Sequence, residues 1–277
     1  VSWASRLPDN PLGRRIARDI AAHGVDVSSV IWADGAEKAG LYFIEPGAAP
    51  RPNRVLYERR DSALARLRAE ELPAAFAAAG RVLHLTGITP ALGEGCRLAW
   101  LASARQARAA GRLVSLDVNY RAKLWSPETA RRALEAILPY VDVLFSGLRD
   151  LALLFGVPEE PEQREVAVRS FAADCGVPLV VATLGAEGAL ACERAGSRVL
   201  REPARPTDVQ ERIGAGDAFA AGFLHGWLEG GVAHGLRCGN ALAALKQTWR
   251  GDATWSTRAD LDDLLRSGAG DPRRVQR

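Results

Sequence analysis

Short apolar runs alternate with longer amphipathic runs along most of the chain after residue 60. The short runs are rich in valine and leucine and predict buried strands at Val82–Leu85, Leu113–Asp117, Val143–Phe145 and Leu179–Ala182. The longer runs repeat at helical spacing and predict helices at Gly95–Ala110, Pro127–Leu138, Leu148–Phe155 and Gln163–Asp174. This alternation predicts an α/β fold, with a mostly parallel central sheet that helices cover on both faces.

The first 60 residues predict a helix, a short strand and then a small β lid. Gly13–Gly24 has the pattern of a helix that ends at a glycine, and Val25–Ile31 has that of a short strand. Two strand-like runs follow, Leu41–Glu45 and Arg54–Arg59, separated by a stretch rich in proline and glycine. We expect these two runs to pair as a β lid.

The last part of the chain predicts a hairpin and then helices. The hairpin joins Ala189–Cys192 to Arg198–Arg201, and helices are expected at Ala215–Glu229, Gly231–Lys246 and Arg258–Leu265. We therefore expect an α/β domain over residues 1–30 and 61–277 and a β lid over residues 31–60. The sequence has no methionine and begins at Val1 in what reads as a strand already under way. We expect N-terminal strands to precede it in the full protein.

Composition and charge exclude several classes of protein. The 277 residues are 48% hydrophobic and 25% charged, as in an ordinary globular protein. The 36 basic and 33 acidic residues are dispersed, which indicates no nucleic-acid partner. No apolar run reaches the roughly 18–20 residues that span a bilayer, so we expect no membrane association. The four cysteines lie far apart in sequence and predict free thiols in a cytoplasmic protein.

The most informative motif is Gly214-Ala215-Gly216-Asp217, which an apolar run of helical period follows. The two glycines let the backbone turn sharply and approach a ligand closely. A helix start has unpaired N–H groups and partial positive charge, so it binds anions. An aspartate there is placed to accept a proton. The motif predicts phosphoryl transfer to an alcohol, with Asp217 as catalytic base and the three preceding amides as an anion hole. An ordinary glycine turn is the alternative.

The stretch GAGDAFAAGF resembles the C-terminal signature of the ribokinase-like (PfkB) carbohydrate kinases. Arg212 and Ile213 stand where that family usually has two threonines. Three segments resemble the 2-keto-3-deoxygluconate kinases within the family: Tyr57–Ala63, Leu85–Leu92 and Asp117–Trp125. The resemblance covers nearly all of the chain. It implies a ribokinase-like three-layer α/β/α fold and transfer of phosphate from ATP, with Mg²⁺, to the terminal hydroxyl of 2-keto-3-deoxygluconate.

The resemblance implies six substrate-binding residues: Tyr42, Tyr57, Arg59, Ile88, Arg121 and Asp252. Arginine suits a sugar acid because its guanidinium donates two parallel hydrogen bonds to a carboxylate. Tyrosines on lid strands offer both a flat apolar face and a hydroxyl donor. The alternatives are ordinary ones: the tyrosines pack within the sheet, Arg59 is a solvated edge charge, and Arg121 forms a structural ion pair with Asp117.

The resemblance also implies the nucleotide side of the site. Its residues are Thr183, Gly185, Gly188 and Asn240. The family's Asn-x-x-Glu magnesium motif is replaced here by Ser146–Arg149 and Asp150, so only Asp150 could stand for the acid. We expect its contact with Mg²⁺ to be indirect, through water.

Three other functions stay open at this point. A kinase for a neutral sugar such as fructose, or for a nucleoside, would not need paired arginines near the lid. A sugar-binding regulator without catalysis could keep the fold, although Asp217 argues against it. A dinucleotide-binding oxidoreductase would need a GxGxxG after a first strand, which the sequence does not contain. The lid strands also make a homo-oligomer plausible by resemblance.

Overall fold

Six strands form the largest sheet of the computed structural model, which describes residues 1–45, 47, 50–51, 54–73, 75–194 and 198–267. Their order is β10-β9-β8-β7-β6-β5. Neighbours β5 and β6 are parallel, as are β7 and β8, whereas β9 and β10 run antiparallel to their neighbours. The predicted α/β fold and β9–β10 hairpin are confirmed. The strands are β5 (Val82–Thr86), β6 (Leu113–Asp117), β7 (Val143–Gly147), β8 (Leu179–Thr183), β9 (Ala189–Glu193) and β10 (Val199–Glu202).

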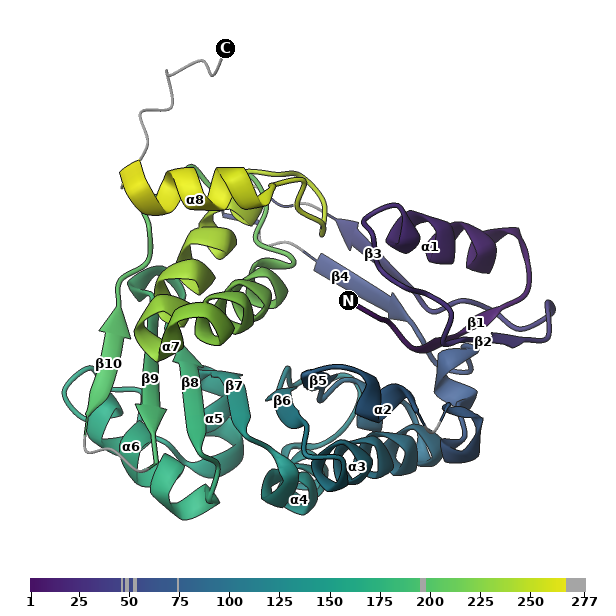
Figure 1. Ribbon diagram of the computed structural model, residues 1–277, viewed down its shortest axis with the longest axis horizontal. Helices are drawn as coiled ribbons and strands as arrows, with labels where there is room; N and C mark the ends of the chain where they lie inside the picture. Colours follow the sequence, from purple (N-terminus) through teal and green to yellow (C-terminus); the bar gives the residue numbers. More distant parts are fainter. Residues whose placement is uncertain (46, 48–49, 52–53, 74, 195–197, 268–277) are drawn as a thin grey trace, which may run out of the picture. The chain divides into compact units, whose positions relative to one another are not determined.

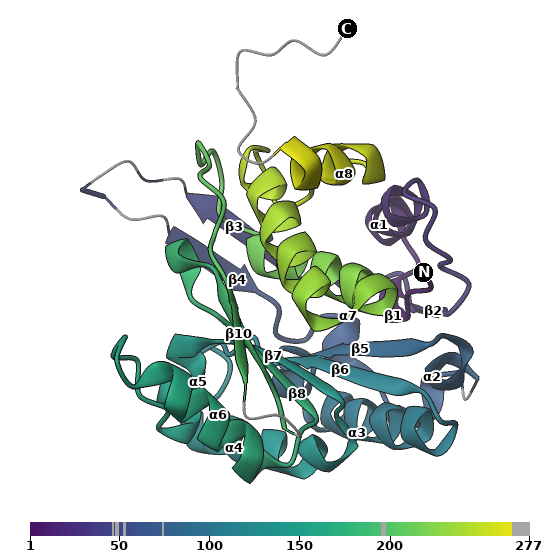
Figure 2. The same cartoon turned by 60° about the vertical axis from the view of Figure 1, so that its left-hand side comes forward.

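The chain divides into two compact units, Val1–Asp142 and Val143–Arg277. In the second unit both faces of the strands are buried. Phe145 of β7 packs edge-on against Phe219 and Phe223 of helix α7 (Ala215–Gln247). The next residue along the strand, Leu144, points to the opposite face and is also fully buried. Helices α5 (Leu148–Phe155) and α6 (Arg164–Cys175) cover that face (Figure 2), so this unit has three layers.

Helix α7 turns back on itself, as the two predicted helices on either side of Gly230 require. Gly230 and Gly231 have non-helical backbone angles, and Gly231 has φ +77°. The two halves then pack closely, since a Cβ on Gly222 would lie 2.6 Å from the carbonyl oxygen of Cys238. The fold-back brings the end of α7 near its beginning (Figure 1). Helix α8 (Arg258–Ser267) packs against α7, with an ion pair between Arg258 and Glu229.

The first unit holds β5, β6 and the smaller sheets. Helix α3 (Glu94–Ala109) packs on β5 and β6, and α4 (Pro127–Ile137) packs on α3. The lid is the antiparallel pair β3 (Leu41–Glu45) and β4 (Arg54–Glu58), as predicted. The division into one domain and a lid stays a prediction. The remaining elements are β1 (Ser5–Pro8), α1 (Pro11–Ala21), β2 (Val30–Ala33), α2 (Phe76–Ala79) and the 3₁₀ turns Leu64–Arg66, Ala69–Glu71, Thr89–Leu92, Leu138–Tyr140 and Gly185–Glu187.

The helices begin and end at local signals in the sequence, and α1 covers Pro11–Ala21 rather than the predicted Gly13–Gly24. Asn10 caps α1 by accepting hydrogen bonds from the N–H groups of Leu12 and Gly13. Ser126 caps α4 in the same way. Gly156 and Gly176 follow α5 and α6 in the left-handed conformation that glycine adopts most easily. Across the described residues, no helix combines the length and the hydropathy that a membrane crossing needs.

The prediction for the early strands was wrong in position. Strand β2 covers Val30–Ala33 rather than Val25–Ile31, and β1 starts at Ser5 rather than at Val1. The reason is a turn, in which the Asp26 carboxylate accepts a hydrogen bond from the N–H of Ser28. Ser2 and Asp26 form an isolated bridge outside the strands, and the Ser2 hydroxyl donates to the Asp26 carboxylate at 3.3 Å.

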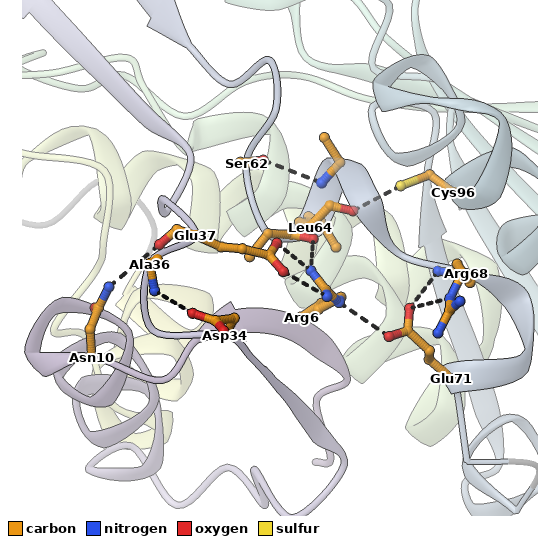
Figure 3. Close-up of polar contacts among 12 residues, drawn as sticks. Arg6, Asn10, Asp34, Ala36, Glu37, Ser62, Leu64, Arg68, Glu71 and Cys96 are labelled. Carbon is orange, nitrogen blue, oxygen red and sulfur yellow. Dashed lines mark hydrogen bonds and ion pairs between the residues drawn. The ribbon is translucent and has the colours of Figure 1, made fainter.

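Arg6 of β1 holds the base of the lid in place (Figure 3). Its guanidinium donates two hydrogen bonds to Glu37, at 2.6 and 2.9 Å, and one to the carbonyl of Ala63 at 2.8 Å. A fourth hydrogen bond, at 3.3 Å, reaches Glu71. Glu37 and Ala63 precede and follow the two lid strands in sequence, so this one side chain fixes both ends of the lid.

We expect the contribution of this network to stability to decrease at acid pH. The hydrogen bonds from Arg6 lower the pKa of Glu37 below its ordinary value. A carboxyl with a lowered folded-state pKa stabilises the fold above its unfolded pKa, about 4.3, and loses that effect as pH falls through the folded value. Glu37→Gln should therefore lower the thermal midpoint at pH 7. The difference from wild type should shrink between about pH 5 and pH 3. A difference that is constant with pH would contradict this role.

Candidate active site

Gly214 is the residue before α7, and the local geometry admits only glycine. Its φ is +81° and its ψ −4°, in the left-handed region. A Cβ here would lie 2.3 Å from the backbone carbonyl oxygen of Asp252. The backbone of Asp252 therefore lies against the motif, whereas its predicted role in binding the substrate stays a prediction. We call residues Glu211–Gly216 the glycine turn.

The glycine turn presents free N–H donors at the start of α7. The first helical hydrogen bond runs from the N–H of Ala218 to the carbonyl of Gly214. The N–H of Ala215 donates within the turn, to the carbonyl of Arg212 at 3.2 Å. Within the described part of the chain, the N–H groups of Gly214 and Gly216 have no backbone partner. Asp217 is the third residue of α7 and is exposed, beside these donors.

The predicted nucleotide residues line one cavity of about 570 Å³ in the second unit. It brings Thr183, Gly185, Gly188 and Asn240 together with Ala215 and Gly216 of the turn. Gly188 has φ +102°, and a Cβ there would lie 2.1 Å from the carbonyl oxygen of Glu202. The Asn240 amide donates to the carbonyls of Glu202 and Pro203, at 2.9 and 3.1 Å. Gly188 and Asn240 thus fix the cavity wall at residues 202–204.

Two arginines of this cavity are not among the predicted site residues. Arg205 and Arg212 both line it. The Arg205 Nε is buried and has no hydrogen-bond partner among the described residues. A buried donor without a partner is costly, so such an atom is suited to a ligand. The cavity therefore combines glycine-rich backbone with positive charge, as a polyphosphate requires.

An ion pair between buried Arg164 and exposed Glu187 supports the turn at Gly185–Glu187. Arg164 of α6 donates two hydrogen bonds to the Glu187 carboxylate, at 2.9 and 2.5 Å. These bonds lower the pKa of the Glu187 carboxyl. Gly185 itself has φ +60°. The ion pair thus holds the glycine-rich turn after β8 against α6.

The lid strands place two tyrosines and an arginine on one face. Tyr42 and Tyr57 are directly paired across β3 and β4, with ring centroids 6.5 Å apart. The Arg59 guanidinium lies 4.5 Å from the Tyr57 ring centroid and 5.6 Å from that of Tyr42. Burial lowers the pKa of Arg59, and the charge of Arg121 lowers it further. Lys123, which sequence analysis did not select, donates to the carbonyl of Val55 at 2.9 Å.

Two strand ends position Arg121 and Ile88. A Cβ on Gly87, which follows β5, would lie 2.1 Å from the carbonyl oxygen of Val118, which follows β6. The segments around Ile88 and Arg121 are therefore in contact through their backbones. The Arg121 guanidinium donates to the carbonyl of Tyr120, and no described carboxylate pairs with it. The alternative of an ion pair with Asp117 is not seen.

Asp150 lies in the first turn of α5 and does not line the 570 Å³ cavity. In the described ranges no three His, Cys, Asp or Glu side chains are grouped so that they could hold a metal ion. The donor set therefore does not suit a cation held by protein ligands alone. It is compatible with a magnesium ion that arrives on the nucleotide phosphates and keeps its water ligands.

Comparison with known proteins agrees with this chemistry. Residues 1–258 match the family model described as pfkB family carbohydrate kinase. The chain belongs to the pfkB family. This pfkB-family chain is 40% identical over 269 residues to a 2-dehydro-3-deoxygalactonokinase of Haloferax volcanii, a match that covers 97% of this chain and 82% of the relative. It is 30% identical over 254 residues to a 2-dehydro-3-deoxygluconokinase of Bacillus subtilis, with coverages of 91% and 76%.

A solved structure confirms the ribokinase-like fold of this pfkB-family chain. The 2-dehydro-3-deoxygluconokinase of Thermotoga maritima is 28% identical and superposes with a TM-score of 0.85. The match covers 95% of this chain and 83% of the other. The fold class and the family predicted from the motifs are therefore both confirmed.

We expect Gly214 and Gly216 to differ sharply when replaced by alanine. Gly214→Ala combines a strained φ with a 2.3 Å clash against backbone, so it should cost about 2 kcal/mol or more. A Cβ on Gly216 meets nothing within 4 Å, and alanine is the better helix former. Gly216→Ala should therefore stabilise by about 0.5–1 kcal/mol. Urea unfolding of both variants measures this, and equal effects would contradict the described turn.

Proposed function

We propose that this pfkB-family enzyme transfers the γ-phosphoryl group of ATP to the terminal hydroxyl of 2-keto-3-deoxygluconate, giving 2-keto-3-deoxy-6-phosphogluconate. Its relatives support the coarser assignment to a sugar-acid kinase of that family. We further propose that the reaction takes place in the cytoplasm.

The observation that carries the proposal is which of the arginines that are not exposed have a carboxylate partner and which do not. Six described arginines are not exposed: Arg6, Arg59, Arg97, Arg121, Arg164 and Arg205. Arg6, Arg97 and Arg164 each pair with a carboxylate, as a desolvated charge requires. Arg59, Arg121 and Arg205 do not, within the part of the chain that the structure describes. They are the half-buried cations that can take a ligand's negative charge.

We assign Arg59 and Arg121 to the carboxylate of the sugar acid. They lie close enough for the charge of one to lower the pKa of the other, an arrangement that an anion between them would relieve. The Tyr42 and Tyr57 rings would cover the carbon chain, and their hydroxyls would bond its oxygens. Ile88 would contribute the second lone pair of its backbone carbonyl, which already accepts from the N–H of Ala91 at 3.1 Å, because its own N–H bonds the Thr86 hydroxyl at 3.3 Å.

The second unit would carry the phosphoryl transfer. Asp217 removes the proton of the acceptor hydroxyl, and Asp252 remains a candidate contact for the substrate. The free amides of Gly214 and Gly216 hold the charge that develops on the phosphoryl oxygens, joined by Ala215 if its long bond to Arg212 opens. Thr183, Gly185, Gly188 and Asn240 form the walls around ATP. Arg205 and Arg212 balance the phosphate charge.

Magnesium would neutralise charge on the phosphates of ATP. Asp150 is the proposed protein group for it, acting through water. The other residues of the chain bind, orient and deprotonate the two substrates.

The C4 epimer is a second candidate substrate. The Haloferax volcanii relative is described as a 2-dehydro-3-deoxygalactonokinase and has the higher identity of the two relatives compared above. Coupled ADP-release assays with 2-keto-3-deoxygluconate, 2-keto-3-deoxygalactonate, fructose and ribose test the proposal. A kcat/KM for fructose or ribose that equals or exceeds those for both acids would overturn it. No turnover of any of them would favour the non-catalytic regulator.

The lid also supports a proposal for assembly. Leu41, Phe43 and Leu56 lie on the face of β3 and β4 opposite Tyr42 and Tyr57, with 39%, 58% and 66% of their surfaces exposed. We propose that this apolar face pairs with a second copy of the chain. Sedimentation of the wild type should give a dimer, and a monomer at micromolar concentration would contradict it.

Asp217→Asn tests the catalytic base. Asparagine keeps the shape of the side chain but cannot accept the proton. We expect kcat to fall by roughly 10²–10⁴, with little change in KM, because that is the usual effect of losing a general base. Steady-state kinetics measure this. A variant that keeps more than about a third of the wild-type kcat, with chemistry rate-limiting in both, would refute the assignment.

Arg59→Ala tests the carboxylate contact, with the exposed neighbour Arg60→Ala as its matched control. A charge-assisted hydrogen bond contributes about 1.5–3 kcal/mol, so KM for the acid should rise roughly 10- to 150-fold in Arg59→Ala. Arg59→Lys should rescue only part of this, because lysine lacks the two-pronged geometry. Arg121→Ala should behave like Arg59→Ala. An unchanged KM in both would show that these arginines serve the structure alone.

A further inference from the structure

Lys246 is a buried lysine that the mechanism above does not use. It lies in the last turn of α7, and only 1% of its surface is exposed. The chain around it is apolar, with the sequence Ala243-Ala244-Leu245 on its N-terminal side. A buried ammonium group is costly unless each of its N–H donors has an acceptor. Its contacts therefore indicate what it is there to hold.

The Lys246 ammonium bonds three backbone carbonyls. The distances are 2.7 Å to Gly251, 3.4 Å to Glu211 and 3.4 Å to Trp249. No carboxylate among the described residues pairs with it. Its three donors thus meet three acceptors, all of them on the main chain. An arrangement of this kind fixes backbone segments and needs no change of charge.

The three carbonyls belong to the two segments that enclose Gly214. Glu211 begins the glycine turn, whereas Gly251 precedes Asp252, whose carbonyl faces Gly214. The Lys246 Cε would lie 3.3 Å from a Cβ on Gly214. The next residue contributes as well, because the carbonyl of Gln247 accepts from the N–H groups of Gln210 and Glu211. The end of α7 thus holds the turn that leads into its beginning.

We propose that Lys246 is a positioning residue for phosphoryl transfer. By bonding carbonyls of both segments that enclose Gly214, it holds the free amides of Gly214 and Gly216 in fixed directions. Its buried positive charge also adds to the positive potential at the start of α7. The proposal rests on the proposed function for its catalytic consequence. Its structural consequence, an ordered glycine turn, can be measured without any reaction.

The first test compares Lys246→Met with two controls on the same helix. Methionine keeps the length and the apolar stem but removes the N–H donors. Thr248→Val removes a helix-end hydrogen bond to Leu245 that does not involve the turn. Leu236→Ala opens a cavity in the core around α7 and lowers stability away from the turn. Kinetics use whichever substrate the wild type phosphorylates best.

In Lys246→Met we expect kcat to fall about 10- to 100-fold, the effect of misplacing a catalytic group by about 1 Å. KM for the sugar acid should stay within about threefold, because Arg59 and Arg121, the residues proposed to bind its carboxylate, lie in the first unit. Both controls should keep the wild-type kcat per folded molecule. A kcat within twofold of wild type in Lys246→Met, or an equal loss in Leu236→Ala, would overturn the proposal.

A second variant covers the case in which Lys246→Met does not fold. Lys246→Ala leaves room for a small amine, so methylammonium chloride should restore kcat in a saturable manner. Tetramethylammonium chloride has the same charge and no N–H donors, and it should restore nothing. Equal effects of the two salts would overturn the proposal.

Hydrogen exchange separates this proposal from the proposed function. The amides of Gln210, Glu211 and Ala215, which hydrogen-bond backbone carbonyls at the glycine turn, should exchange about tenfold faster or more in Lys246→Met than in Thr248→Val, whatever the enzyme phosphorylates. If no substrate is turned over but exchange rises in this segment, the proposed function fails and the positioning role of Lys246 stands. Unchanged exchange in folded Lys246→Met would remove the positioning role.

Discussion

The return of α7 on itself is the constraint on which the second unit and its 570 Å³ cavity depend. The break at Gly230 and Gly231 allows two helical halves to run back along each other. Their contact is so close that side chains are excluded at Gly222 and Gly239, where a Cβ would lie within 3 Å of its neighbours. Because the halves are in register, the last turn of the helix reaches the residues before its first turn. A single helix therefore supplies both the amides proposed to bind phosphate and the support for the loop that precedes them.

Most of the fold could be predicted from the sequence, because its signals are local. Apolar strands of the right length, helix caps at Asn10 and Ser126, and glycines after α5 and α6 are all legible within a few residues. The errors arose where a side chain competed with the strand ladder. Asp26 closes a turn through its own carboxylate and delays β2 by several residues. An apolar pattern alone carries no sign of such a bond.

In the candidate site, too, local sequence signals could be recognised, whereas contacts between distant segments could not. The residues of the glycine-rich motifs line one cavity, because close backbone approach leaves a mark in the sequence as glycine. Arg205 and Lys246 were missed because their roles depend on segments distant in sequence. The Nε of Arg205 is buried and lacks a hydrogen-bond partner among the described residues. Lys246 bonds the carbonyls of residues 211, 249 and 251, which only the folded chain brings together. A lone lysine in an alanine- and leucine-rich helix was the only available signal, and it does not reveal the partner segments.

The scarcity of lysine gives this chain an unusual chemical property. Its three lysines are Lys38, Lys123 and Lys246, and the first two are exposed. Reagents that acylate amines would therefore modify the lid side of the molecule readily and leave Lys246 untouched as long as the glycine turn is intact. Acylation of Lys246, read by mass spectrometry, would therefore report opening of the glycine turn.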